Sequence, residues 1–571
     1  MGATQRTDTA ATPTPPRDRA APSSSRQPRW TPLIGAGLRA RTLRRARRLG
    51  DLSFWARHTA RIQRAQLRSL LRAAAFTEIG REHGFSRLAC LPDSEIAPAF
   101  QKALPLADYY RYRTAIARMR ENAEPDVLWP GVVMDFAQTS GTTAGDKYIP
   151  VSKQMLRSNF LASLDIFATA ARFGVRLSRM TSGKCLFLGG SSDLTANAHG
   201  VRTGDLSGIV TPLIRWPISE IYAPGPDIAL MSHWPSKIEA MAEACLYEDI
   251  RMISGMPSWT LVLFERVIQL ARQEGRDVST VREVWPNLEL FVHGGVKYSP
   301  FDSRVRRLYS GSATGDDIPR RLELYPASEG FIAMQDIPGD PGMRLLSDLG
   351  VFYEFVPLER IDDSNAPAFT ADQVEKGQRY VVVMTTCAGL WRYIIGDVVE
   401  FDTIPARLGA PSNRASVGGR GSGPCRLRIV GRHRHFINAF GENLIVEHIE
   451  NAVAAAASKT GITIGEFTAA PVYPREGYRA GLELAIEMDP APPPPCLDEF
   501  ALAFDTALKQ QNVDYTTKRT DDVGMAPPTI TPLRQGALHR WMASKGKLGG
   551  QHKCPRCANH REIIEGVIAA S

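Results

Sequence analysis

The 571-residue sequence contains few cysteines and no long apolar run. Eight scattered cysteines are too few for the disulfide framework of a secreted scaffold, which favours reduced thiols and a cytoplasmic location. No stretch approaches the roughly 18 apolar residues of a membrane-spanning helix, and the N-terminus lacks the apolar core of a secretory signal. Arg6 stands where an N-myristoylation site would require Ser or Thr. We therefore expect a cytoplasmic protein without a membrane span.

Two common enzyme signatures are also missing. No Gly-x-Ser-x-Gly elbow supports a hydrolase, and no Gly-x-x-x-x-Gly-Lys-Ser/Thr loop supports a Walker-type nucleotide site. Hydrophobic residues make up 43% of the chain and charged residues 23%, which excludes collagen-like, coiled-coil and fully disordered proteins. The length is enough for about two to four globular domains.

Positive charge is concentrated at the N-terminus. The chain carries 69 Lys and Arg residues against 60 Asp and Glu residues, a net charge of +9. Residues 1–50 hold eleven arginines, no lysine and two aspartates, so this segment accounts for the whole excess. We expect residues 1–50 to be a disordered Arg-rich tail, either an organellar address or a disordered leader. This charge allows an alternative for the whole protein, namely that it is a non-catalytic basic protein whose tail binds nucleic acid or acidic lipid.

The rest of the chain alternates helix-length segments with short apolar runs. A helical pattern covers Trp55 to Leu71. The strand-like runs are Cys185–Leu188, Leu288–Val292, Leu322–Tyr325, Val351–Val356 and Tyr380–Thr385. Strands of this length between helices predict an α/β protein with largely buried sheets. Pro405–Gly423 is rich in Gly, Ser and Arg, which predicts a surface insertion near a domain boundary.

The most informative segment is a polar loop between Phe136 and Pro150. Its small residues leave backbone N–H groups free to surround an oxyanion, its hydroxyls add donors, and Lys147 adds positive charge. The loop residues are Thr139, Ser140, Gly141, Thr142 and Thr143. An ordinary polar turn would have the same composition, so the segment alone leaves both readings open.

Two further segments suit a nucleotide site. In the first, Tyr325 offers a ring that can stack on a base, and Glu329 offers a carboxylate that can bind Mg²⁺. In the second, Gly396-Asp397 follows an apolar run and places a carboxylate where ribose hydroxyls could donate to it. Each segment separately is also compatible with a solvated strand end or a plain turn.

The order and spacing of the three segments resemble the adenylate-forming superfamily. Within it the sequence is most similar to the Gretchen Hagen family, the auxin-responsive acyl-acid-amido synthetases. That family carries motifs close to Ser-Gly-Thr-Thr/Ser, Tyr-x-x-Ser-Glu and Tyr-Arg-x-Gly-Asp. Similar segments also occur at Thr77–Phe85, Phe352–Pro357, 431–445 and 549–557, so the resemblance extends from about Arg61 to Glu565.

The resemblance implies the adenylate-forming enzyme fold. Residues 51–430 would form a large N-terminal domain of buried β-sheets flanked by helices, which binds nucleotide and acyl acid. Residues 431–571 would form a small, mobile α/β C-terminal lid, with a hinge at Gly431-Arg432. The implied activity is a two-step ligation, in which ATP adenylates a carboxylic acid and the amine of an amino acid then displaces AMP.

The resemblance also assigns roles to residues. The loop Thr139–Gly145 would hold phosphate oxygens, Glu329 would hold Mg²⁺, and a C-terminal lysine would stabilise the α-phosphate. Lys553 matches the family lysine best, with Lys547 and Lys545 as reserves. The remaining nucleotide-binding residues would be Tyr325, Ser328, Asp397 and Arg432.

Three features depart from the pattern or compete with it. The arginine of the third motif is absent, because this chain reads Tyr393-Ile-Ile-Gly-Asp397 with Arg392 before it. His293 could be a catalytic base, although a strand end in the wall of the acyl pocket fits it better. His552, Cys554, Cys557 and His560 have spacing that raises a zinc hypothesis, but the family's Pro-Arg-Cys motif explains Cys557 without a metal.

We therefore predict an ATP- and Mg²⁺-dependent acyl-acid amido synthetase that acts on a small carboxylic acid and an amino acid. No nucleic-acid partner is expected. Within the same fold, the alternative is a ligase that transfers the acyl group to coenzyme A or another thiol. The acyl-pocket residues of the plant enzymes have no recognisable counterparts in this sequence.

Overall fold

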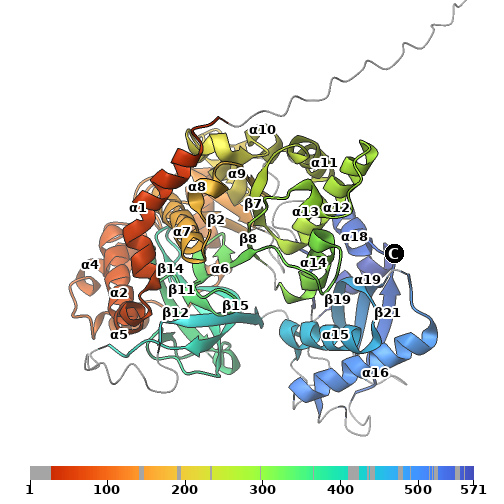
Figure 1. Ribbon diagram of the computed structural model, residues 1–571. Coiled ribbons are helices and arrows are strands. Elements are labelled where there is room, and N and C mark those ends of the chain that lie inside the picture. Colours follow the sequence, from red (N-terminus) through yellow and green to blue (C-terminus); the bar gives the residue numbers. More distant parts are fainter. Residues whose placement is uncertain are drawn as a thin grey trace, which may run out of the picture.

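The structure is a computed structural model of the whole chain (Figure 1). It describes residues 28–139, 147–189, 194–231, 234–295, 298–363, 365–408, 423–433, 436–437, 444–472, 480–488, 490–512, 515–516, 519, 525–546, 553–558 and 560–571. The predicted insertion at 405–423 lies mostly outside these ranges. Within the part of the chain described, no helix is long and apolar enough to cross a membrane.

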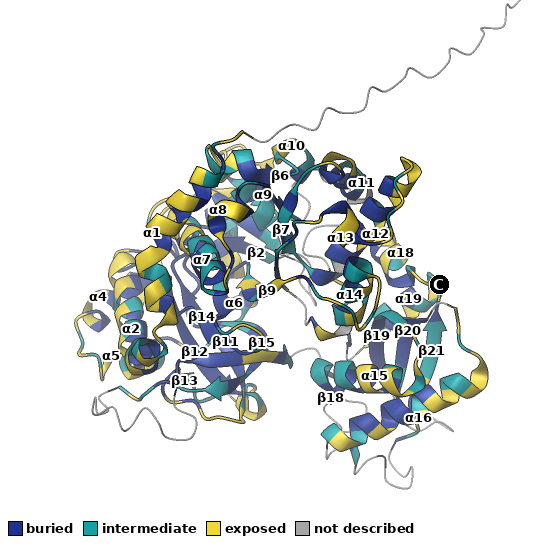
Figure 2. Ribbon diagram, in the orientation of Figure 1, coloured by how far each residue is buried: buried dark blue, intermediate teal, exposed yellow. Residues whose placement is uncertain are grey.

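The N-terminal region is helical from Pro32 onward, which corrects part of the expected disordered tail. Helix α1 (Pro32–Gly50) packs on α7 (Lys153–Arg172) and α8 (Leu177–Met180). It buries Ile34 and Leu38, and Arg45 on the same helix pairs with Asp165 and Asp348. Its other arginines point outward, so the segment looks disordered by composition although one face is apolar (Figure 2). Residues 1–27 of the expected tail lie outside the described ranges.

A group of helices follows α1 and covers one side of the large sheet. Asp51 caps the first of them by accepting a hydrogen bond from the Phe54 backbone N–H, which fixes the turn out of α1. These helices are α2 (Leu52–Ala73), α3 (Glu78–Glu82), α4 (Phe85–Leu88), α5 (Ile96–Ala103) and α6 (Tyr109–Glu121). The amphipathic pattern predicted from Trp55 to Leu71 is confirmed as part of α2.

A small sheet presents the first predicted motif. Strands β1 (Asp135–Thr139) and β2 (Lys147–Pro150) pair antiparallel, with Thr139 opposite Lys147. Strand β5 (Arg202–Gly204) pairs parallel to β1, and β4 (Thr195–Ala196) completes the order β2-β1-β5-β4. The oxyanion loop is therefore the connection of a hairpin.

The large sheet has twelve strands, in the order β13-β12-β14-β15-β16-β11-β10-β9-β8-β7-β3-β6. The strands β6, β3, β7, β8 and β9 are parallel, and the remaining pairs are antiparallel. Their bounds are β3 (Lys184–Phe187), β6 (Tyr222–Ala223), β7 (Ile250–Gly255), β8 (Leu290–Gly294), β9 (Arg320–Ala327), β10 (Gly330–Gln335), β11 (Met343–Leu345), β12 (Val351–Pro357), β13 (Phe369–Thr370), β14 (Arg379–Thr386), β15 (Tyr393–Thr403) and β16 (Arg426–Arg432). All five predicted strand-like runs fall in this sheet.

Helices cover both faces of the parallel part. Consecutive residues within each strand belong to two different cores, because successive side chains in a strand point to opposite faces. Ile253 and Phe291 pack with α11–α14, whereas Met252 and Val292 pack with α1 and α7. The helices and 3₁₀ turns between residues 206 and 310 are α9 (Leu206–Val210), η1 (Thr211–Leu213), η2 (Ile218–Ile221), α10 (Pro226–Ala229), α11 (Trp234–Cys245), α12 (Pro257–Gln273), α13 (Val281–Val284), η3 (Ser299–Phe301) and α14 (Asp302–Ser310). The turn η4 (Leu358–Arg360) follows β12 in the antiparallel part.

The C-terminal part forms a separate α/β unit with its own core, drawn in blue in Figure 1. The chain leaves the large sheet at Arg432, the end of β16, one residue beyond the expected start of the lid. The elements are β17 (Phe436–Ile437), β18 (Leu444–Ile445), α15 (Val446–Thr460), β19 (Ile464–Val472), β20 (Gly481–Met488), α16 (Pro494–Gln511), β21 (Thr529–Leu533), α18 (Ala537–Ser544) and α19 (Glu562–Ala569).

Candidate active site

A cavity of about 2550 Å³ lies between the large sheet and the C-terminal unit. The ends of β7, β8 and β9 form one wall, and Tyr393, Ile395 and Asp397 of β15 form another. The C-terminal unit faces them with residues that include Glu487, His539 and Lys553. Open α/β sheets bind ligands at the carboxyl ends of their parallel strands, so the position suits a substrate site.

Tyr325 and Asp397 meet at the cavity although 72 positions separate them. The Tyr325 hydroxyl, on β9, donates a hydrogen bond of 2.6 Å to Oδ2 of Asp397, on β15. Both side chains are buried. Gly396, at φ +95°, lies in an irregular stretch of the β14–β15 pairing, and such bulges re-aim side chains next to active sites. The two predicted nucleotide residues are therefore brought together.

The second motif is a two-residue connection between β9 and β10. Ala327 pairs with Gly330, which leaves Ser328 and Glu329 at the turn. Gly330 adopts φ +148°, a conformation that L-residues rarely reach. Ser328 and Glu329 are both buried and both line the cavity, so the turn directs a hydroxyl and a carboxylate toward it.

The first motif is described only at its edges. Thr139 ends β1, and Lys147 begins β2 and lines the cavity. Ser140, Gly141, Thr142 and Thr143 lie outside the described residues, as does the side chain of Thr139. Lys147, at the described edge of the first motif, thus borders the same cavity as the other two motifs.

Lys553 reaches across from the C-terminal unit. Its Nζ donates a hydrogen bond to the backbone carbonyl of Gly295, which directly follows β8. Lys545 is exposed at the end of α18 and does not line the cavity, and Lys547 lies outside the described residues. Of the three predicted lysines, Lys553 is the one that the structure places at the site.

Two other predicted residues, Arg432 and His293, lie on strands β16 and β8 of the large sheet. Arg432 pairs through its backbone with Asp397 in the β15–β16 register, while its side chain is outside the described part. His293 is the last residue but one of strand β8 and lines the cavity. Burial lowers its pKa to about 3, and the nearby Arg321 cation acts in the same direction. The imidazole is therefore neutral near pH 7. It contacts the Tyr298 ring at a centroid distance of 4.6 Å, and among the described residues its buried Nδ1 has no hydrogen-bond partner.

Arg392 does not take the place of the missing motif arginine. Its guanidinium pairs with Glu354 at 2.9 Å and donates to the backbone carbonyl of Leu104 at 2.6 Å. It is buried, at the unusual φ of +46°, and it does not line the cavity. Arg392 therefore ties the end of α5 to the large sheet.

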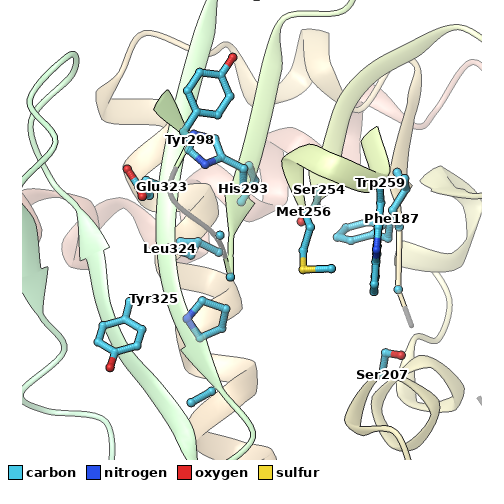
Figure 3. A pocket seen from close by; sticks show the side chains of 18 of the residues that line it. Phe187, Ser207, Ser254, Met256, Trp259, His293, Tyr298, Glu323, Leu324 and Tyr325 are labelled. Atoms are coloured by element: carbon cyan, nitrogen blue, oxygen red, sulfur yellow. The ribbon is translucent and has the colours of Figure 1, made fainter. Parts of the chain in front are cut away.

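The cavity also has an apolar part that the sequence did not reveal. Phe187 comes from β3, Met256 follows β7, and Trp259 comes from α12 (Figure 3). Tyr222 of β6 also lines this part. The Phe187 and Tyr222 rings lie 5.5 Å apart. Three separate segments supply these side chains, so no linear motif could identify them.

The zinc hypothesis gains no support in the described residues. Among them, no group of three or more His, Cys, Asp or Glu side chains could hold a metal ion. Cys557 is buried in the apolar core of the C-terminal unit, and burial raises its thiol pKa. A protonated thiol is a poor zinc ligand. His552 lies outside the described part.

Three family models match most of the chain. The GH3 family N-terminal domain matches residues 48–223 and 204–314, the central domain residues 344–407, and the C-terminal domain residues 447–562. The matches cover the first and third predicted motifs, whereas the second, with Tyr325, Ser328 and Glu329, falls between the N-terminal and central domains.

Curated relatives have low but extended similarity. A probable indole-3-acetic acid-amido synthetase GH3.1 of Arabidopsis thaliana is 22% identical over 82% of this chain and 84% of its own length. A probable indole-3-acetic acid-amido synthetase GH3.2 of Oryza sativa subsp. japonica is 25% identical over 64% of this chain. The matched region spans about half of that rice protein, 54% of its length.

Solved structures share the fold. A GH3.15 acyl acid amido synthetase superposes with a TM-score of 0.71 at 17% identity, over 90% of this chain and 94% of its own. A 2-hydroxyisobutyryl-CoA ligase in the postadenylation state gives a TM-score of 0.53 at 14% identity, over 89% and 92%. The predicted adenylate-forming fold, a large domain of buried sheets with a small C-terminal α/β unit, is confirmed.

Proposed function

The chain belongs to the GH3 family, and from this we propose that it is an ATP-dependent acyl-acid amido synthetase. First, a carboxylate oxygen of the acid bonds to the α-phosphorus of ATP, and the bond from that phosphorus to pyrophosphate breaks. Then the amine nitrogen of an amino acid bonds to the carbonyl carbon, the carbon–oxygen bond to AMP breaks, and the nitrogen loses a proton. The products are an amide, AMP and pyrophosphate.

One arrangement carries this proposal. The cavity is bordered by the Tyr325–Asp397 pair, by Glu329 and by Lys553, which come from β9, β15, the β9–β10 turn and the C-terminal unit. An adenosine group needs an aromatic wall and an acceptor for ribose hydroxyls, which Tyr325 and Asp397 can supply. A reacting phosphate needs cations, which Lys553 and Lys147 can supply.

Charge stabilisation is the main contribution of the protein to the first step. The loop Thr139–Gly145 would donate backbone N–H and hydroxyl hydrogen bonds to phosphate oxygens. Lys553 would approach the α-phosphate, where negative charge accumulates as the fifth oxygen enters. Arg432 and Ser328 complete the proposed nucleotide contacts.

A magnesium ion fits the residues present. Mg²⁺ takes oxygen ligands and is often held by one or two carboxylates together with substrate phosphates. Glu329 offers such a carboxylate at the cavity wall. When bound, the ion would neutralise charge on the departing pyrophosphate.

The C-terminal unit would reorient between the two steps. Gly431-Arg432 ends β16, the last strand before that unit, so a backbone rotation there would swing Lys553 away and admit the amine.

The eight cysteines are all free thiols, which supports a reducing, cytoplasmic compartment.

The test is ATP–pyrophosphate exchange across aromatic, indole and aliphatic acids. Acid-dependent exchange is expected, and amide should form when an amino acid is added. Coenzyme A serves as the competing acceptor: a thioester in place of an amide would identify a thiol ligase. Absence of exchange with every acid, together with no ATP binding, would refute the ligase proposal.

A further inference from the structure

The cavity continues well beyond the reacting groups. From the ends of β7 and β8 it runs along the sheet face that packs on α1 and α7. The large apolar side chains of its distant part are Leu38, Phe160, Leu164, Phe167, Leu213 and Ile214. ATP, the acid and the amine share the total volume, so the total does not indicate the size of the acid. The apolar extension is the part that indicates it.

This distant wall is apolar but poorly covered. Phe160 is 52% exposed and Leu213 is 46% exposed, although large apolar residues are usually buried. Phe160 and Phe167 lie on one face of α7, seven positions apart, with Ser163 between them. Exposed apolar surface that is continuous with a binding site commonly marks the place of an apolar ligand.

The wall is continuous with the reaction centre. Phe187, Phe167 and Leu164 pack against the same core cluster, which also contains Val292 of β8 and Leu324 of β9. Figure 3 shows Met256 between His293 and the side chains of Phe187 and Trp259, so the wall reaches the start of the proposed adenylation site. An acid whose carboxylate lies near Lys553 can therefore extend its body along this wall.

Polar side chains also line the extension, among them Asn159, Ser163 and Thr211. Ser207 lines it too, and within the described part of the chain its buried hydroxyl has no hydrogen-bond partner. At the outer end, the Arg41 guanidinium lies over the Phe160 ring at 5.6 Å. An unbroken hydrocarbon chain can lie against the apolar side chains of this wall, whereas a compact acid would leave them in contact with water.

We propose that the acid adenylated by this protein has a long apolar tail, of the fatty-acid type, and that the tail lies in the channel between the sheet and α7. This inference rests on the proposed function. The carboxylate is adenylated near Lys553, and the tail runs past Phe187 and Phe167 toward Arg41. Affinity then comes mainly from burial of methylene groups.

The test is a series of straight-chain acids from four to eighteen carbons in ATP–pyrophosphate exchange, beside indole and benzoic acids. We expect kcat/KM to rise about three- to fourfold per methylene until the channel is filled, because each buried CH₂ contributes about 0.8 kcal/mol. Exchange that is best with compact aromatic acids and flat across chain length would overturn this inference and leave the ligase intact. No exchange with any acid would refute the proposed function instead.

Two variants of α7 locate the tail. Ser163→Trp should fill the channel and shorten the preferred acid by several carbons. Leu161→Trp is the matched control, because Leu161 is on the same helix, is 37% exposed and does not line the cavity. A chain-length optimum that is unchanged in Ser163→Trp would place the tail elsewhere and overturn the inference.

Discussion

Lys553 of the C-terminal unit donates a hydrogen bond to the backbone carbonyl of Gly295, 258 positions earlier in the chain. Gly295 has φ +81°, and a Cβ there would lie 3.0 Å from Nζ of Lys553. The contact joins the two units at the point where β8 meets the cavity. A cation held there is ready to meet a phosphate that enters between the units.

Lys553→Ala should therefore slow adenylation by about 10²–10³-fold, the usual effect of removing one group that stabilises transition-state charge. The measurement is acid-dependent pyrophosphate exchange at saturating ATP. Lys545→Ala is the control, because that lysine is exposed and does not line the cavity. Normal exchange in Lys553→Ala would show that another cation serves the α-phosphate.

Tyr325→Phe removes the donor that Asp397 accepts from at 2.6 Å. We expect a higher KM for ATP and a loss of about 1–2 kcal/mol in the free energy of unfolding, since a buried carboxylate loses one hydrogen bond. The control is Tyr353→Phe, which removes a 2.9 Å hydrogen bond to the Phe331 carbonyl and changes a side chain that does not line the cavity. Equal effects of both variants on KM would show that the Tyr325 hydroxyl has no special role at the nucleotide.

Glu329→Gln keeps the size of the side chain and removes its charge. If Glu329 binds the metal, the Mg²⁺ concentration for half-maximal exchange should increase about tenfold, equivalent to 1.4 kcal/mol. Titration of exchange activity with MgCl₂ measures this, with the exposed Glu359→Gln as control. An unchanged Mg²⁺ requirement would assign the metal to other ligands.

Stability should fall in mild acid because two histidines are buried in the neutral form. Burial is the main cause that lowers the pKa of His293 to about 3 and of His448 to about 4, from 6.5, with Arg321 and Arg379 as the secondary causes. Between pH 6.5 and these values the unfolded chain binds protons that the folded chain excludes. The free energy of unfolding is thus highest above pH 6.5 and decreases by up to about 1.4 kcal/mol per pH unit for each histidine as the pH falls.

Replacing one histidine tests this dependence. In His448→Gln, the free energy of unfolding should depend less steeply on pH between 6 and 4.5. The difference in slope should correspond to about one proton, or about 1.4 kcal/mol per pH unit. Urea denaturation at several pH values gives the slope. An identical slope in the variant would mean that His448 titrates normally in the folded protein.

Arg392 should prove structural. Arg392→Met leaves Glu354 buried without its cation, which typically costs about 3–5 kcal/mol. The double variant Arg392→Met/Glu354→Gln should recover part of this loss, because no buried charge remains unpaired. Chemical denaturation measures the stability, and the KM for ATP of the folded double variant should match the parent. A raised KM without loss of stability would instead place Arg392 at the nucleotide.

The motifs were recognisable because each depends on local chemistry. Gly330 and Gly396 are glycines because the backbone adopts positive φ there, and such requirements are visible in sequence. The strands were predictable because buried strands are continuous apolar runs. The helix at Pro32–Gly50 was missed because its many arginines obscure a buried apolar face, which includes Ile34, Leu38 and Leu49.

The linear order of residues was sufficient to predict the fold class, the family and the three nucleotide motifs, since each is encoded in neighbouring positions. The meeting of Tyr325 with Asp397, and of Lys553 with Gly295, depended on chain folding, because strand order and the position of the C-terminal unit bring distant segments together. The same holds for the apolar channel. Its walls come from α1, α7, β3 and the η1 region, and only their packing makes those scattered side chains one surface.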